Sequence, residues 1–163
     1  QRQMCIRDRY IRSGFRTRDL YLDIADEYFP NGYRVGEDED YNKLVEIAKD
    51  KYKIDEEIPS KHSIEAMVGR SDFIQIDRGT YLPEKYCVEL PELLVDKILN
   101  YISENNLVYY RSIYEKFNRE LLELGIHNHY YLKGCIDKKL SDDMVSKRDY
   151  IVNGNQDLSL IHI

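Results

Sequence analysis

The stretch SKHSIEAMVGRSDFIQIDRGTYL, residues 60–82, decides the expected fold. Ser60 is a favourable helix N-cap, and the apolar residues Ile64 and Val68 recur at helical spacing behind it. Gly69 then ends the predicted helix. The runs FIQI and TYL that follow are rich in strand-forming residues, and the DRG between them supplies the glycine of a tight turn. This stretch therefore predicts a short helix followed at once by a β-hairpin.

Two further helices are expected upstream. The first covers about residues 18–29, and Pro30 with the Asn-Gly pair after it ends the helix. The second covers about residues 41–52 and follows the acidic run GEDED of residues 36–40, whose charges suit the positive end of a helix. We interpret this run as a solvated helix start; the alternatives are a docking site for a partner or a cation site, although the spacing does not fit an EF-hand. Three helices and a hairpin in this order are typical of a winged helix, in which a helix can enter a DNA major groove.

The second half of the chain repeats this order. Residues 84–91 form a predicted linker with prolines near both ends. The elements expected after it are a helix over about 92–104, a short strand at 107–109, a helix over 111–124, a third helix that begins after Asn128, and a second hairpin, or wing, over 144–152 with SKRD at its middle.

These elements predict a mainly α fold with small β-wings (α+β), made of two tandem winged-helix modules at residues 17–83 and 92–153. A weak spacing match supports a tandem repeat, because Ala66 precedes Tyr81 by 15 residues and Gly134 precedes Tyr150 by 16. In each pair, a small residue of the third helix would precede an aromatic residue of the second wing strand.

Both ends of the chain resemble translated sequencing adapter. One short duplex reads ATG TGT ATA AGA GAC AG on one strand and CTG TCT CTT ATA CAC ATC on the other. Its translations match residues 4–9 and the LSLIHI of residues 158–163. We therefore expect residues 1–9 and 158–163 to be adapter-derived tails that carry no information about the fold. The segment between them is then expected to be a fragment of a longer protein.

The chain is acidic. The tails contribute three arginines and one aspartate to its 24 basic and 30 acidic residues, so 21 and 29 remain without them, a net charge of −8. Residues 19–57 alone hold 13 acidic and 5 basic residues. Phosphate binding requires clustered lysine and arginine side chains, so this balance argues against strong DNA binding over the whole surface but leaves room for one basic face.

The composition and the motifs narrow the possible functions. Hydrophobic residues make up 42% of the sequence, which is enough for a folded core, and no apolar run reaches membrane-spanning length. Cys87 and Cys135 are isolated in the sequence and lack metal or redox spacing. His127, His129 and Cys135 could suggest a zinc site, but no fourth ligand lies at a recognised spacing from them. No catalytic motif is present. We therefore expect a cytoplasmic protein that is not an enzyme, with no membrane contact, metal or other cofactor.

The run SIEAMVGRSDFIQIDRGTYLP, residues 63–83, resembles the third helix and wing of the HARE-HTH type of winged-helix domain. It is also similar to helix-turn-helix modules of bacterial proteins described as sigma-factor-like. The pattern Ile-x-Ala-x-x-x-Arg at the helix end and the Arg-Gly-Thr-Tyr of the wing carry this resemblance. The later run GIHNHYYLKGCIDKKL, residues 125–140, followed by KRDYIV, resembles a second such module. The resemblance implies DNA binding in a regulator or a DNA-processing protein.

Candidate DNA contacts occur in both predicted modules. Asparagine and lysine side chains can reach base edges or phosphates from a helix, and basic wing residues can reach a flanking phosphate. The alternative for every candidate is an ordinary solvated surface, and Glu65, Asp72 and Asp77 cancel much of the charge of the first module. The candidates are Asn128, His129, Tyr130, Lys133, Lys138, Lys139, Lys147 and Arg148 in the second module, and Lys61, His62, Arg70 and Arg78 in the first.

The leading hypothesis is binding of double-stranded DNA by a bacterial-type regulator or DNA-processing protein. The helix of residues 128–139 would enter the major groove, and Lys147 and Arg148 would clamp the backbone. The second hypothesis is a protein-interaction module, in which the acidic first half binds a basic protein partner without direct DNA contact. A third reading is a non-catalytic piece of an enzyme.

Overall fold

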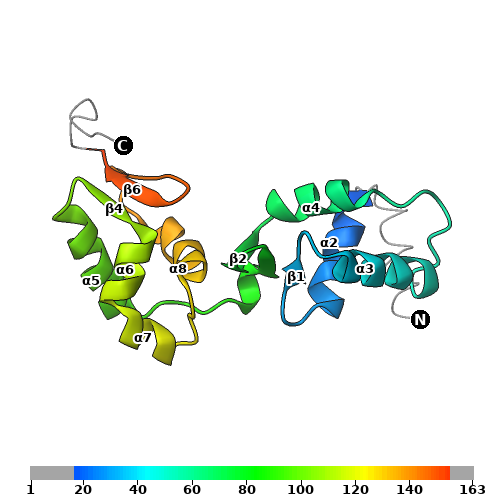
Figure 1. Cartoon of the computed structure of the whole chain (residues 1–163), viewed down its shortest axis with the longest axis horizontal. Helices are drawn as coiled ribbons and strands as arrows, with labels where there is room; N and C mark the ends of the chain where they lie inside the picture. The colour runs from blue at the N-terminus through cyan, green and yellow to red at the C-terminus, as the bar shows by residue number, and fades with distance from the viewer. Residues whose placement is uncertain (1–16, 155–163) are drawn as a thin grey trace. The chain divides into compact units, whose positions relative to one another are not determined.

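The computed structural model describes residues 17–154 and shows an α+β fold of short helices and two small sheets (Figure 1). The expected α+β class is therefore confirmed, whereas the two adapter-like tails lie outside the described residues. The described chain divides into two compact units. The first comprises residues 17–75 and 79–86, and the second comprises residues 76–78 and 87–154.

The first unit contains three helices and a sheet in the strand order β1-β3-β2. The strand β1 was not predicted, because two residues carry no alternation of apolar and polar side chains. It pairs antiparallel with β3, and Tyr33 lies opposite Tyr81. The elements in chain order are α2 (Thr17–Tyr28), β1 (Tyr33–Arg34), α3 (Asp38–Asp50), α4 (Lys61–Gly69), β2 (Phe73–Asp77, of which residues 73–75 belong to this unit), β3 (Thr80–Pro83) and the short 3-10 helix η1 (Glu84–Tyr86).

One side chain from each helix of the first unit lies at the centre of its core. Ile24 of α2, Leu44 of α3 and Ile64 of α4 are fully buried together. Tyr52, just after α3, is also fully buried, and its ring meets the edge of the Tyr28 ring with a centroid distance of 6.3 Å. At roughly 2 kcal/mol for each large apolar side chain removed from water, such burial is what holds three short helices together.

The second unit also runs from a helix and a strand through further helices to a hairpin, but it has one helix more, and its strand order is β4-β6-β5. Val108 lies opposite Ile151, and both side chains are buried. The elements are α5 (Glu92–Ser103), β4 (Leu107–Tyr109), α6 (Tyr110–Lys116), α7 (Asn118–Glu123), α8 (His129–Ile136), the 3-10 helix η2 (Asp137–Lys139), β5 (Met144–Ser146) and β6 (Tyr150–Asn153).

The prediction of a single helix over residues 111–124 was wrong. The chain leaves helical geometry at Phe117, where φ is −109° and ψ is 20°, and this separates α6 from α7. The Phe117 side chain is buried and meets the ring of Tyr101 edge-on at 6.0 Å. The break lets Ile113 before it and Leu121 after it both reach the core. Tertiary packing therefore overrides a helical pattern that contains no proline or glycine.

The helix that precedes the hairpin begins in the same way in the two units. Ser60 caps α4 and is followed by buried residues four and eight positions later, Ile64 and Val68. Asn128 caps α8 with the same spacing to the buried Leu132 and Ile136. In each helix, the cap side chain accepts a hydrogen bond from the backbone N–H three residues on, at 3.2 Å from Ser63 and 3.0 Å from Tyr131.

The aromatic residues of the predicted repeat do not correspond, however. Tyr81 lies opposite the buried Tyr33 and packs against the first core. Tyr150 lies opposite the exposed Tyr109, and its neighbour Ile151 is the residue that enters the second core. The counterpart of Tyr81 is therefore Ile151, because alternate residues of a strand point to opposite faces.

Candidate nucleic-acid interface

The helix α8 has one buried face and one partly exposed face. Its capping residue, Asn128, uses its side-chain oxygen to accept the Tyr131 N–H. This bond satisfies one of the N–H groups that every helix start leaves without a helical partner. His129, Tyr130 and Lys133 lie on the partly exposed face. The cap therefore orients the helix, while the three other candidates remain accessible from solvent.

His129 and Tyr130 lie side by side at the start of α8. Their rings have a centroid distance of 4.2 Å and an angle of 31°. Burial, followed by the nearby positive charge of Arg111, lowers the pKa of His129 below its usual value. The imidazole is therefore neutral at pH 7, so this residue offers a hydrogen bond or a stacking surface rather than a positive charge.

Lys133 connects α8 to the turn of the β5–β6 hairpin. Its Nζ donates hydrogen bonds to the backbone carbonyls of Lys147 and Arg148, both at 2.9 Å. The same ammonium group lies 5.3 Å from the centre of the Tyr110 ring. Lys133 was predicted as a DNA contact, and the structure shows that its charged end already has backbone partners.

A second set of polar contacts lies below the surface in the same unit. The hydroxyl of the buried Tyr110 donates to Oδ1 of Asp137 at 2.5 Å and lies 2.5 Å from the Ser146 hydroxyl. Ser146 also donates to Asp137 at 3.0 Å. Burial, then the bond to Asp137, raises the pKa of Tyr110, which therefore keeps its proton. This cluster joins α6, η2 and β5.

Four basic candidates of the second unit are exposed. Lys138 and Lys139 follow α8 in η2, and Lys147 and Arg148 occupy the hairpin turn. Their charges are not the only ones in this region, because Asp142, Asp143 and Asp149 lie in the same segment. The basic side chains therefore form two short groups, one at each end of the β5 segment, rather than a broad positive surface.

The candidates of the first predicted module are placed less favourably for phosphate binding. The Nζ of Lys61 lies 2.9 Å from Asp38 and 4.0 Å from Glu65, and it donates to the carbonyl of Gly36 at 3.1 Å. The hydrogen bond to Asp38 raises the pKa of this amine. The other three candidates are exposed. His62 lies on α4, Arg70 directly follows α4, and Arg78 lies in the β2–β3 turn.

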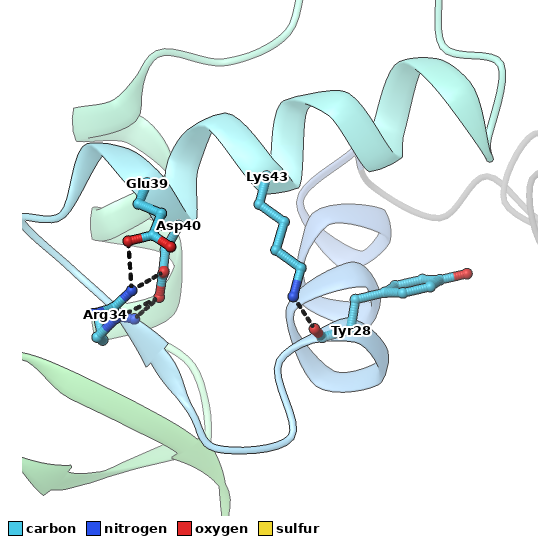
Figure 2. A network of polar contacts seen from close by, with 5 residues as sticks. All are labelled: Tyr28, Arg34, Glu39, Asp40 and Lys43. Atoms are coloured by element: carbon cyan, nitrogen blue, oxygen red, sulfur yellow. Dashed lines mark hydrogen bonds and ion pairs between the residues drawn. The ribbon is translucent and has the colours of Figure 1, made fainter.

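The acidic run at the start of α3 contains a contact that the sequence did not indicate. Asp40 was interpreted as part of a solvated helix start, but its side chain is buried and binds Arg34 of β1 (Figure 2). Glu39 adds an exposed ion pair to Arg34 at 3.4 Å, and Lys43 donates to the carbonyl of Tyr28 at 3.1 Å. The one available signal was a single arginine that precedes four consecutive acids.

Residues 17–154 also bear on other kinds of site. They contain no group of three or more His, Cys, Asp or Glu side chains arranged to hold a metal ion. No helix in this part of the chain is long and apolar enough to cross a membrane. No protein-family model, curated protein sequence or solved structure matches the chain.

Proposed function

We propose that the chain is a DNA-binding fragment of a bacterial-type transcriptional regulator or DNA-processing protein, built from two tandem winged-helix modules of the HARE-HTH-like type. The repeated order of helix, strand, further helices and hairpin supports this proposal. So do the strand orders β1-β3-β2 and β4-β6-β5, in which the last strand of each hairpin is central. The fragment would act in the cytoplasm.

In this proposal the second module makes the main DNA contact. Its α8 enters the major groove with His129 and Tyr130 toward the base edges. Lys138 and Lys139 reach phosphates beside the groove, and the wing residues Lys147 and Arg148 reach the flanking backbone. The observation that carries the proposal is the position of exposed basic pairs both after α8 and in the turn of the hairpin that follows it.

The test is a titration of the chain with random duplex DNA at two salt concentrations. Each neutralised phosphate adds about 0.9 to the slope of log affinity against log salt, so four basic contacts predict a slope of roughly −3 to −4. Lys138→Glu with Lys139→Glu should abolish binding. The matched control, Lys97→Glu with Lys116→Glu, changes the net charge equally at exposed positions of α5 and α6 and should leave most of the affinity.

Two results would reject this assignment. Unchanged affinity of the Lys138→Glu, Lys139→Glu variant at low salt would remove α8 and η2 from the interface. Equal losses in both double variants would mean that net charge, rather than a particular surface, controls binding.

The second candidate function is a protein-interaction module in which the acidic first half binds a basic partner. The exposed Glu37, Asp38 and Glu39 at the start of α3 favour it. It predicts no DNA binding even at low salt and a complex with a basic protein that dissociates as the salt concentration rises.

A further inference from the structure

We propose that Lys133 is a positioning residue that holds the wing of the second module in its DNA-binding conformation, rather than a residue that contacts DNA. The expected effect of Lys133 on DNA binding rests on the proposed function. Its structural part, the control of the wing turn by Lys133, can be tested without DNA.

Three consecutive backbone carbonyls of the wing turn accept hydrogen bonds from the body of the unit. Lys133 donates to the carbonyls of Lys147 and Arg148, both at 2.9 Å, and the backbone N–H of Tyr110 donates to the carbonyl of Asp149 at 3.0 Å. An ammonium group has three hydrogens, so one lysine can serve two carbonyls at once. Bonds from a charged donor are also stronger than those from a neutral one.

These bonds decide which side of the turn faces outward. With the carbonyls engaged by the body of the unit, the side chains of Lys147 and Arg148 are exposed. The Tyr110–Asp137–Ser146 cluster fixes the end of β5, directly before the turn. The turn is therefore held at both ends before DNA arrives, which lowers the ordering cost of binding.

The first unit cannot form the same contact. The matched spacing of the two caps and buried residues places Glu65 of α4 at the position of Lys133 in α8. A carboxylate accepts hydrogen bonds and cannot donate them to turn carbonyls. The Glu65 carboxylate lies 4.0 Å from the Nζ of Lys61, on its own helix. The wing-holding lysine is thus a property of the second unit.

The first experiment measures backbone amide hydrogen exchange in the DNA-free chain. Lys133→Met keeps the length and helix propensity of the side chain but removes its donors. We expect faster exchange at residues 147–150 in this variant and unchanged exchange there in the control Lys97→Met, an exposed lysine of α5. Lys133→Gln serves the same purpose if the methionine variant does not fold. Unchanged exchange of the turn in a folded variant would overturn the inference.

The second experiment is a double-mutant cycle in DNA affinity. Lys133→Met should weaken binding about tenfold in the otherwise unchanged chain, which is the loss expected for one charge-assisted hydrogen bond. In a Lys147→Met, Arg148→Met background, the same change should have little effect, because the residues through which Lys133 acts are gone.

A direct phosphate contact gives a different result. Lys133→Met would then weaken binding equally in both backgrounds and reduce the salt slope by about 0.9, which would overturn the inference. If the unchanged chain does not bind DNA at all, the proposed function fails, and the exchange experiment alone decides whether Lys133 holds the turn.

Discussion

The carboxylate of Asp40 accepts three hydrogen bonds from Arg34. The backbone N–H of Arg34 donates to Oδ2 at 2.9 Å, its Nε donates to Oδ2 at 3.2 Å, and its Nη2 donates to Oδ1 at 2.7 Å (Figure 2). This pair fastens the short strand β1 to the first turn of α3. Burial by itself raises the pKa of Asp40, but the bonds and charge of Arg34 outweigh it and lower the pKa below its usual value.

We expect Asp40→Asn to destabilise the first unit. The side chain of Asp40 is 8% exposed, but that of Arg34 is 46% exposed, so water screens part of the attraction. The loss should therefore be about 1 kcal/mol, rather than the 3–5 kcal/mol of a fully buried pair that loses one partner. Urea unfolding at pH 7 measures it. Glu39→Gln, at an exposed position, is the control and should change stability by less than about 0.5 kcal/mol.

The contribution of Asp40 should also depend on pH. Because its pKa is lowered in the folded chain, its stabilising effect is complete above the unfolded value of about 3.9 and is lost as the pH falls through the folded value. The difference in unfolding free energy between the unchanged chain and Asp40→Asn should be constant from pH 7 to about pH 5 and should shrink below pH 4. A difference that grows on acidification would contradict this account.

Removing the cap of α4 should weaken the first unit. The Ser60 side chain accepts the N–H of Ser63 at 3.2 Å, and Ser60→Ala leaves that donor to water. The expected cost is about 1 kcal/mol, and Ser60→Asp, which keeps an acceptor, should restore it. Chemical denaturation of both variants gives the comparison. If aspartate fails to restore stability, the hydroxyl does not act as a cap.

Removing the hydroxyl of Tyr110 should destabilise the second unit moderately. Tyr110→Phe keeps the buried ring and leaves Asp137 and Ser146 bonded to each other at 3.0 Å. We therefore expect a loss of about 1–2 kcal/mol, near that of a single hydrogen bond to a charged group. Tyr109→Phe, at an exposed position of β4, is the matched control and should be nearly neutral in thermal unfolding. Equal losses in the two variants would show that the buried cluster adds nothing.

Cys135 should react slowly with alkylating reagents in the folded chain. Burial, followed by the nearby Cys87, raises the pKa of the Cys135 thiol to about 12. Only the thiolate reacts, so modification at pH 8 should be slower than in the urea-unfolded chain by about a thousandfold. Mass spectrometry of the Cys135 peptide over time measures both rates. Similar rates in the folded and unfolded chain would place this thiol outside the core.

Features built from neighbouring residues could be predicted from the sequence. The hairpin around Gly79 and the helix caps Ser60 and Asn128 lie where the sequence placed them. Gly79 has a φ of +74°, which explains why the turn needs a glycine. The spacing of Leu132 and Ile136 likewise identified the buried face of α8. In all these cases the interaction joins residues within one turn of helix or one tight turn, so the local pattern contains it.

The candidate site could be predicted only in part. The exposed pair Lys147 and Arg148 follows from a hairpin with KR at its turn, because turn side chains face solvent. The role of Lys133 does not follow, since its partners are carbonyls 14 and 15 residues further along the chain. Backbone carbonyls occur at every residue, so a sequence gives no sign of which ones a lysine will reach.

Local sequence was therefore sufficient for the type and order of most helices and hairpins, because caps, turns and apolar spacing act between near neighbours. Three features depended on the folded chain as a whole. The strand β1 exists because β3 pairs with it, the helix breaks at Phe117 because the core accepts that ring, and Asp40 is buried because Arg34 neutralises it. Each needs a partner that is distant in sequence or a core that several elements build together, and such contacts form only when the units pack.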